Sequence, residues 1–196
     1  CEVEITRLNE PNGKQDQYAA AYGGLNVIEF HTDNTVSVIP LHLSKDLSTE
    51  LENSLFMFYT GDQRSASHIL QEQKKNVDQK EKFEALKEMG ALVYELRTAL
   101  QKGNLDDFGQ LLHTNWLLKK RLASGITNPD IDRAYEAGLK AGSLGGKLLG
   151  AGGGGFLLFF CPPQRAEALR AALQPLKPFP FGFDRDGSKI IYYGED

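Results

Sequence analysis

The stretch Gly150–Gly155 constrains this chain most, because five of its six residues are glycine and the sixth is Ala151. Glycine loses more backbone entropy on folding than any other residue, so a dense run inside a folded domain needs a reason. The run follows a predicted helix at Ile131–Ser143 and precedes an apolar run, Phe156–Cys161, typical of a buried strand. Two interpretations stay open: a tight helix-to-strand connection packed against a neighbour, or a loop whose bare amides bind an anion.

Neither common phosphate-binding fingerprint fits this stretch. Gly150, Gly152 and Gly155 match G-x-G-x-x-G, but a dinucleotide fingerprint needs a strand before the glycines and a helix after them. A Walker A loop is excluded because Ala141 stands where its first glycine should be, and Leu148 where Ser or Thr should be.

Composition narrows the class of protein. A length of 196 residues with 41% apolar residues suits one or two globular domains, and a net charge of −4 argues against a nucleic-acid partner. The two cysteines, Cys1 and Cys161, have neither metal spacing nor a pairing pattern, which fits a reduced cytosol. The longest apolar run, Phe156–Cys161, is too short to span a membrane. We therefore expect a cytoplasmic protein without metal-ligating residues or a membrane partner. The sequence predicts no oligomeric state.

A polar tetrad, Lys14-Gln15-Asp16-Gln17, is the first stretch with chemical interest. It follows the helix breakers Pro11 and Gly13 and leads into small residues that end at Gly23-Gly24, so we expect a rigid platform presenting polar groups. Asp16 could act as a base or orient a hydroxyl. Alternatively, it could cap a short helix at Gln17–Tyr22, and the two roles are compatible.

Arg64 is a candidate phosphate ligand. The run Leu55–Thr60 is apolar on both faces, which predicts a central strand, and Asp62 and Ser65 after Gly61 are helix-starting residues. Arg64 then lies near a helix N-terminus at the end of a buried strand, where anions and ligands bind. The alternative is a surface arginine in the first helical turn.

Two long helices are expected in the middle of the chain. Apolar residues recur every three or four positions in the first: Phe83, Leu86, Met89, Val93, Leu96 and Leu100. Gly103 ends this helix and Asn104 caps the next, whose apolar side carries Leu105, Phe108, Leu112 and Trp116. We expect His113 to be structural. The terminal cations Lys119-Lys120-Arg121 are dipole partners, or one of them reaches an anionic substrate.

The remaining elements define the fold class. Leu25–Phe30 and Val36–Pro40 predict a hairpin, and Asn128-Pro129-Asp130 opens the helix that ends near Ser143. A helix at Gln164–Leu173 follows. A closing hairpin is then expected, with strands Phe179–Phe183 and Ile190–Tyr193 around Asp186-Gly187. This order predicts an α+β fold in which helices cover an antiparallel sheet.

Two motifs together resemble those of the GHMP kinases, the family of galactokinase, homoserine kinase and mevalonate kinase. Gly150–Phe156 is similar to the third motif of that family, and Gly13–Tyr18 resembles the segment that carries the catalytic aspartate in its sugar kinases. The resemblance implies a ferredoxin-like C-terminal domain at residues 46–196. Residues 1–45 would be a remnant of a ribosomal-S5-like N-terminal domain.

A longer combination is more selective within this family: the stretch from Gly13–Gly24 through Ile28–Phe30, together with Gly145–Phe156, resembles its sugar-phosphate kinases. This resemblance implies transfer of a phosphoryl group from ATP, with Mg²⁺, to the anomeric hydroxyl of D-glycero-D-manno-heptose 7-phosphate. Asp16 matches the aspartate that handles the hydroxyl proton. The loop that supports the nucleotide phosphates matches Gly150, Ala151, Gly152, Gly153, Gly154 and Gly155. We expect Lys14, Gln15 and Arg64 to bind the substrate, with Lys14 and Arg64 at its 7-phosphate because of their charge.

The sequence departs from the family in one respect. Neither the first motif nor the second, of the Pro-x-x-x-Gly-Leu-x-Ser-Ser type that wraps the ATP phosphates, occurs in these 196 residues. With Cys1 in place of an initiator Met and Glu2–Leu8 resembling a helix already in progress, we expect a C-terminal part of a longer protein, inactive by itself. Two alternatives remain: a kinase of a free sugar such as fucose or galactose, and a non-catalytic binding domain.

Overall fold

The computed structural model describes residues 1–10, 13–61 and 66–194. The chain divides into two compact units, one formed by Cys1–His42 with Gly182–Asp196 and the other by Leu43–Phe181. Each unit is described by itself. No helix among the described residues combines the length and the apolar character needed to cross a membrane.

The first unit contains the predicted hairpin. A π-helix, η1 (Glu2–Arg7), precedes α1 (Gln15–Tyr22), β1 (Asn26–Phe30) and β2 (Val36–Pro40). The two strands pair antiparallel with Ile28 opposite Val38, so the hairpin prediction is confirmed. Tyr18 of α1 contacts the edge of Phe30 with ring centroids 5.7 Å apart, which ties the helix to the hairpin.

The C-terminal segment of this unit corrects one prediction. Neither Phe179–Phe183 nor Ile190–Tyr193 forms a strand, so the expected closing hairpin is wrong. Gly187 instead packs against Gly23 so closely that a Cβ on Gly23 would lie 2.2 Å from the Gly187 nitrogen. The Ser188 amide donates to Ala21 O at 3.1 Å. The Asp186-Gly187 pair therefore packs against the C-terminal end of α1 and does not form the turn of a hairpin. Ile191, in the second expected strand, is 90% exposed.

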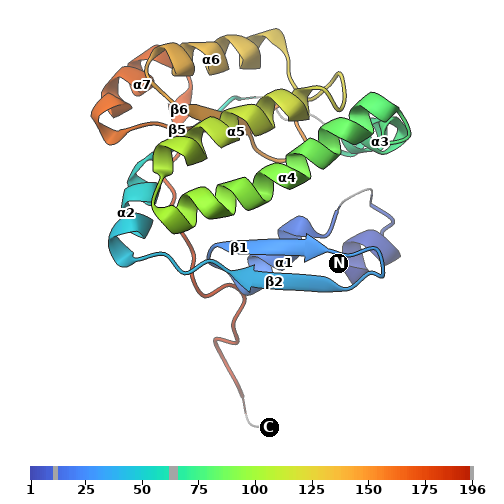
Figure 1. Ribbon diagram of the computed structural model, residues 1–196. Helices are drawn as coiled ribbons and strands as arrows, with labels where there is room; N and C mark the ends of the chain where they lie inside the picture. The colour runs from blue at the N-terminus through green and yellow to red at the C-terminus, as the bar shows by residue number, and fades with distance from the viewer. Residues whose placement is uncertain (11–12, 62–65, 195–196) are drawn as a thin grey trace. The chain divides into compact units, whose positions relative to one another are not determined.

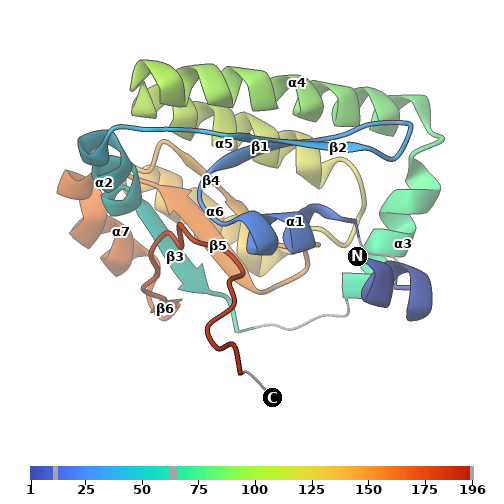
Figure 2. The same cartoon turned by 90° about the horizontal axis from the view of Figure 1, so that it is seen from below.

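The second unit is an α+β domain, as predicted (Figure 1, Figure 2). Its elements in chain order are α2 (Lys45–Asn53), β3 (Leu55–Tyr59), α3 (Ala66–Asn76), α4 (Lys80–Lys102), α5 (Leu105–Lys120), α6 (Pro129–Lys140), β4 (Gly145–Leu148), β5 (Phe156–Phe160), η2 (Pro163–Arg165), α7 (Ala166–Ala172) and β6 (Lys177–Pro178). The strands form one antiparallel sheet in the order β4-β5-β3-β6. Since β3 lies between two strands, its predicted central position is confirmed.

Capping residues set the helix boundaries where the sequence predicts them. Gly103 ends α4 in the left-handed conformation with φ 72°, which a residue without a Cβ adopts freely. The Asn104 side chain accepts a hydrogen bond from the Asp107 amide, and Asn128 accepts from the amides of Asp130 and Ile131. The α6 helix ends at Lys140 rather than near Ser143, and Gly142 follows with φ 109°.

The buried face of α4 differs from the predicted apolar stripe. The buried residues are Ala85, Leu92, Ala99 and Leu100, whereas Phe83, Leu86 and Val93 are exposed. Two apolar stripes run along this helix, and the one containing alanines faces the core. Small side chains let a neighbouring helix approach closely, and α5 runs antiparallel beside α4 (Figure 1).

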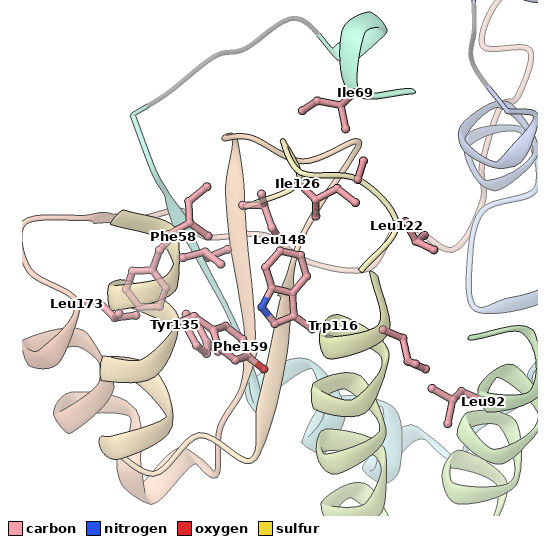
Figure 3. Packing of buried hydrophobic residues seen from close by; sticks show 14 of the residues in the cluster. Phe58, Ile69, Leu92, Trp116, Leu122, Ile126, Tyr135, Leu148, Phe159 and Leu173 are labelled. Atoms are coloured by element: carbon pink, nitrogen blue, oxygen red, sulfur yellow. The ribbon is translucent and has the colours of Figure 1, made fainter. Parts of the chain in front are cut away.

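The core of the second unit is aromatic. Trp116 of α5 is fully buried, and Figure 3 shows its indole ring among Ile126, Leu148 and Tyr135. The Tyr135 ring stacks on Phe159 with centroids 5.6 Å apart. Cross-strand partners share a face of a sheet, so Leu148, Leu157 and Phe58 lie on the same buried face as Phe159. This core fixes the ends of α5, β3 and β4, which surround the glycine loop.

Candidate functional site

Strand β4 changes the context of the glycine loop. The sequence predicts that a helix leads directly into the glycines, but β4 intervenes and pairs antiparallel with β5, so the helix-to-strand interpretation is wrong. The loop joins two strands of a hairpin. The strand was not predicted because it begins with Gly145 and Gly146, and glycine has a low strand propensity. Here their smallness is required, because a Cβ on Gly145 would lie 2.0 Å from Gly109 O of α5.

The loop backbone needs glycine for two different reasons. Gly150, Gly152, Gly153 and Gly155 have φ values of 71°, 119°, 77° and 104°, which L-residues rarely adopt. Gly152 also touches a neighbouring backbone, since an added Cβ would lie 2.7 Å from the Ile126 Cα. Gly150 and Gly155 have open space at the Cβ position. Only part of the loop is therefore held by packing.

Hydrogen bonds hold the second half of the loop. The Gly153 amide donates to Ile126 O at 2.9 Å, and Ile126 belongs to the connection between α5 and α6. The Gly155 amide donates to the Thr60 hydroxyl oxygen at 3.0 Å, and the Thr60 amide donates back to Gly155 O at 2.9 Å. The loop is thus fixed between the end of β3 and the α5–α6 connection.

Lys119, in the last turn of α5, contacts the first half of the loop. Its Nζ donates to Gly150 O at 2.5 Å and to Leu148 O at 3.3 Å. Its neighbours have other partners: Lys120 pairs with Asp132 at 3.2 Å and Arg121 with Glu81 at 3.5 Å. Of the three cations at this helix end, Lys119 is the one bound to the glycine loop.

Several loop amides have no hydrogen-bond partner among the described residues. Within the part of the chain that the structure describes, the amides of Gly150, Ala151, Gly152 and Gly154 donate no hydrogen bond. Unpaired amides in a loop of positive-φ glycines form a concave site that attracts anions. The anion-binding interpretation of the sequence therefore has a structural basis.

Asp16 lies in the first unit, in the first turn of α1, where its side chain is exposed. The helix begins at Gln15 rather than Gln17, and the residue before it is Lys14, so the prediction that Asp16 is the N-cap is wrong. Lys14, Gln15 and Asp16 are brought together at one helix N-terminus, whose dipole favours anionic groups.

Arg64 lies outside the described residues, as do Asp62 and Ser65. The described residues just before them are Thr60 and Gly61, and Gly61 has φ 84° at the end of β3.

Two partly buried ionisable side chains lie at strand β4, which leads into the loop. His113 Nδ1 is 2.8 Å from the Tyr135 hydroxyl, which donates to Gly146 O of β4 at 3.2 Å. Burial, and then the charge of Lys120, lowers the pKa of His113, in keeping with the structural role expected. Burial also lowers the pKa of Lys147, whose Nζ donates to Asn115 Oδ1 at 3.3 Å.

The sequence does not predict Thr60 and Ile126 as neighbours of the loop, and it leaves the partner of Lys119 open. Thr60 and Gly155 are 95 positions apart in the chain, and no local pattern signals such a contact. No group of three or more His, Cys, Asp or Glu side chains among the described residues is placed to hold a metal ion.

Comparison with known proteins identifies the domain. Residues 96–176 match the family described as GHMP kinases C terminal. The chain is 30% identical over 190 residues to D-glycero-alpha-D-manno-heptose 7-phosphate kinase of Campylobacter jejuni, covering 96% of this chain and 56% of that protein. It is 33% identical over 178 residues to L-fucokinase/L-fucose-1-P guanylyltransferase of Bacteroides fragilis, covering 88% of this chain and 19% of that protein.

A solved structure agrees with this assignment. The crystal structure of a D-glycero-D-manno-heptose 1-phosphate kinase from Bacteroides thetaiotaomicron is 30% identical, with a TM-score of 0.62, covering 97% of this chain and 53% of that one. The chain thus spans about half the length, or less, of the relatives it matches. Its residues 96–176 match the C-terminal domain of the GHMP kinases, and its fold is that of this domain.

Proposed function

We propose that the full-length protein is an ATP-dependent sugar kinase that phosphorylates the anomeric hydroxyl of D-glycero-D-manno-heptose 7-phosphate. The observation that carries this proposal is a glycine loop with four amides that have no partner among the described residues, within the residues that match the GHMP kinase C-terminal domain. The similarity to a heptose 7-phosphate kinase along 96% of the chain supports the choice of substrate.

Each part of the chain has a role in this proposal. Asp16 accepts the proton of the attacking hydroxyl or orients that hydroxyl. The loop amides without a partner among the described residues, those of Gly150, Ala151, Gly152 and Gly154, stabilise the negative charge of the nucleotide phosphates. Mg²⁺, which arrives bound to ATP, supplies charge neutralisation across the β- and γ-phosphates, and no described residue is assigned to it.

Cationic and polar side chains would bind the distal phosphate of the sugar. Lys14 and Gln15 lie beside Asp16 at the start of α1, and Arg64 is proposed from its sequence context alone. Arg64→Ala should raise the KM for the sugar phosphate by about tenfold, since a charge-assisted bond to phosphate is worth roughly 1.5–3 kcal/mol. Steady-state kinetics at saturating ATP measure this, and an unchanged KM would rule out the role of Arg64.

A kinase of a free sugar is the second candidate, favoured by the 33% identity to a fucokinase-containing protein. A free sugar has no distal phosphate, so Lys14→Met and Arg64→Ala would leave its turnover unchanged. The two candidates therefore differ in their acceptor and in their response to these substitutions.

The test is ADP formation by the full-length protein with Mg·ATP and four acceptors: heptose 7-phosphate, mannose 6-phosphate, fucose and galactose. We expect turnover that is highest with the heptose phosphate. Turnover only with an unphosphorylated sugar would support the second candidate and discard the phosphate pocket. No turnover with any acceptor would contradict both and favour a binding domain.

A further inference from the structure

The first half of the glycine loop has one polar tether from outside the loop among the described residues, the Lys119 ammonium group. It donates to Leu148 O at the end of β4 and to Gly150 O in the loop, so its two acceptors lie on either side of Leu149. A hydrogen bond from an ammonium group to a carbonyl oxygen is charge-assisted and stronger than one between neutral groups.

Packing does not replace this tether. A Cβ on Gly150 would find no atom within 4 Å, so the Gly150 backbone has open space on that side. The contacts with Ile126 and Thr60 fix Gly152, Gly153 and Gly155, in the second half of the loop. The Leu149 amide, which donates to Phe156 O at 2.9 Å, fixes the chain just before the loop, and beyond it the orientation of the Gly150 carbonyl depends on Lys119.

The planarity of the peptide bond extends this effect by one residue. The carbonyl of Gly150 and the amide of Ala151 belong to the same peptide plane and point in opposite directions in a trans peptide. When Lys119 holds Gly150 O, the Ala151 N–H is directed away from Lys119. The Ala151 amide donates no hydrogen bond to another described residue, so it is available for a ligand.

From this geometry we infer that Lys119 is a positioning residue of the glycine loop, which holds the Gly150–Ala151 peptide so that the Ala151 amide faces the phosphate of a bound nucleotide. The inference rests on the proposed function for the identity of the ligand. The tether itself can be tested without turnover.

The test compares Lys119→Met, Lys119→Arg and Lys120→Met in the full-length protein. Lys120 is the matched control, because it lies in the same last turn of α5 but pairs with Asp132 rather than with the loop. Hydrogen exchange of the peptide covering Gly150–Gly155 reports on the tether, and exchange of β5 reports on whether the domain stays folded.

We expect exchange of the loop peptide in Lys119→Met to be about tenfold faster, with β5 unchanged, because local opening becomes easier. The kcat should fall about 10- to 100-fold, as for other losses of alignment, with the KM for the sugar within about twofold. Lys119→Arg should bring the loop exchange rate and kcat most of the way back to the wild-type values, because its guanidinium can donate to the same two carbonyls. Lys120→Met should change neither the loop exchange rate nor kcat.

Loop exchange and kcat that stay at wild-type values in Lys119→Met would overturn the inference, and so would equal changes in Lys120→Met. If the wild-type protein turns over no acceptor, the proposed function fails, and the exchange data decide the tether by themselves. Faster loop exchange in Lys119→Met alone would then support the tether, and unchanged exchange would overturn it.

Discussion

Gly150 and Gly152 have positive φ values in the same loop, yet they differ in what surrounds them. A Cβ on Gly152 would lie 2.7 Å from the Ile126 Cα, while a Cβ on Gly150 would meet nothing within 4 Å. Backbone cannot move aside as a flexible side chain can, so the two positions should respond differently to the same substitution.

Gly152→Ala should therefore lower the free energy of unfolding by about 1–3 kcal/mol more than Gly150→Ala, whose cost is limited to about 1–2 kcal/mol of conformational strain. Urea unfolding of both variants beside the wild type measures the difference. Equal losses of stability would show that the contact with Ile126 is not maintained in solution.

His113 predicts a pH dependence of stability. Burial and the nearby Lys120 lower its pKa below the ordinary value of 6.5, so the unfolded chain binds a proton that the folded chain does not. Its contribution is present above about pH 6.5 and is lost as the pH falls toward the lowered pKa of the folded state.

Unfolding free energies measured between about pH 8 and pH 5 should fall less steeply on the acid side in His113→Gln than in the wild type. His31→Gln is the control, because His31 is an exposed residue of the β1–β2 turn. An acid-side slope that His113→Gln leaves unchanged would contradict the assignment.

Among the helices and strands, the sequence predicts a boundary correctly where a single capping residue determines it. Gly103, Asn104 and Asn128 set helix ends because a cap acts within three residues of itself. The strand Gly145–Leu148 was not predicted because its first two residues are glycines. Gly145 is required by a close contact with Gly109 of α5 and Gly146 by one with Leu158 of β5, and neither contact is visible in the local sequence. The C-terminal hairpin was wrongly predicted because Gly187 serves a contact with Gly23 instead of a turn.

The contact between Gly23 and Gly187 can be tested by substitution. Gly23→Ala should displace the segment around Gly187, because the new Cβ would lie 2.2 Å from the Gly187 nitrogen. The Ser188 amide, which donates to Ala21 O, should then lose protection from hydrogen exchange. Gly24→Ala is the control, since Gly24 also has positive φ but its nearest atom would be 3.9 Å away. Loss of Ser188 protection in both variants alike would argue against the contact.

At the scale of the whole molecule, the α+β class, the central β3 and the antiparallel sheet were predictable, because each follows from hydrophobic pattern and order along the chain. The sequence does not predict that Gly182–Asp196 belongs to the first unit, because this depends on backbone contacts between Gly23 and Gly187, which are far apart in the chain. In the candidate site, the glycine loop was predictable from composition. Its supports, Thr60 and Ile126, required the folded structure.

In the proposed reaction, a residue of one unit handles the substrate proton and a loop of the other binds the phosphates of the nucleotide. Asp16 lies in the unit that contains α1, and the glycine loop lies in the other unit, within the residues 96–176 that match the GHMP kinase C-terminal domain. We propose that both serve one reaction, the transfer of a phosphoryl group to a sugar.

The measurement that tests this claim most directly is the kcat of Asp16→Asn in the full-length protein with heptose 7-phosphate and saturating Mg·ATP. The matched control is Asp46→Asn, since Asp46 is an exposed aspartate at the same position in the first turn of α2. We expect kcat to fall by about 10²- to 10⁴-fold in Asp16→Asn and to stay at the wild-type value in the control. A kcat of Asp16→Asn equal to that of the wild type would contradict the role of Asp16 and the kinase mechanism proposed.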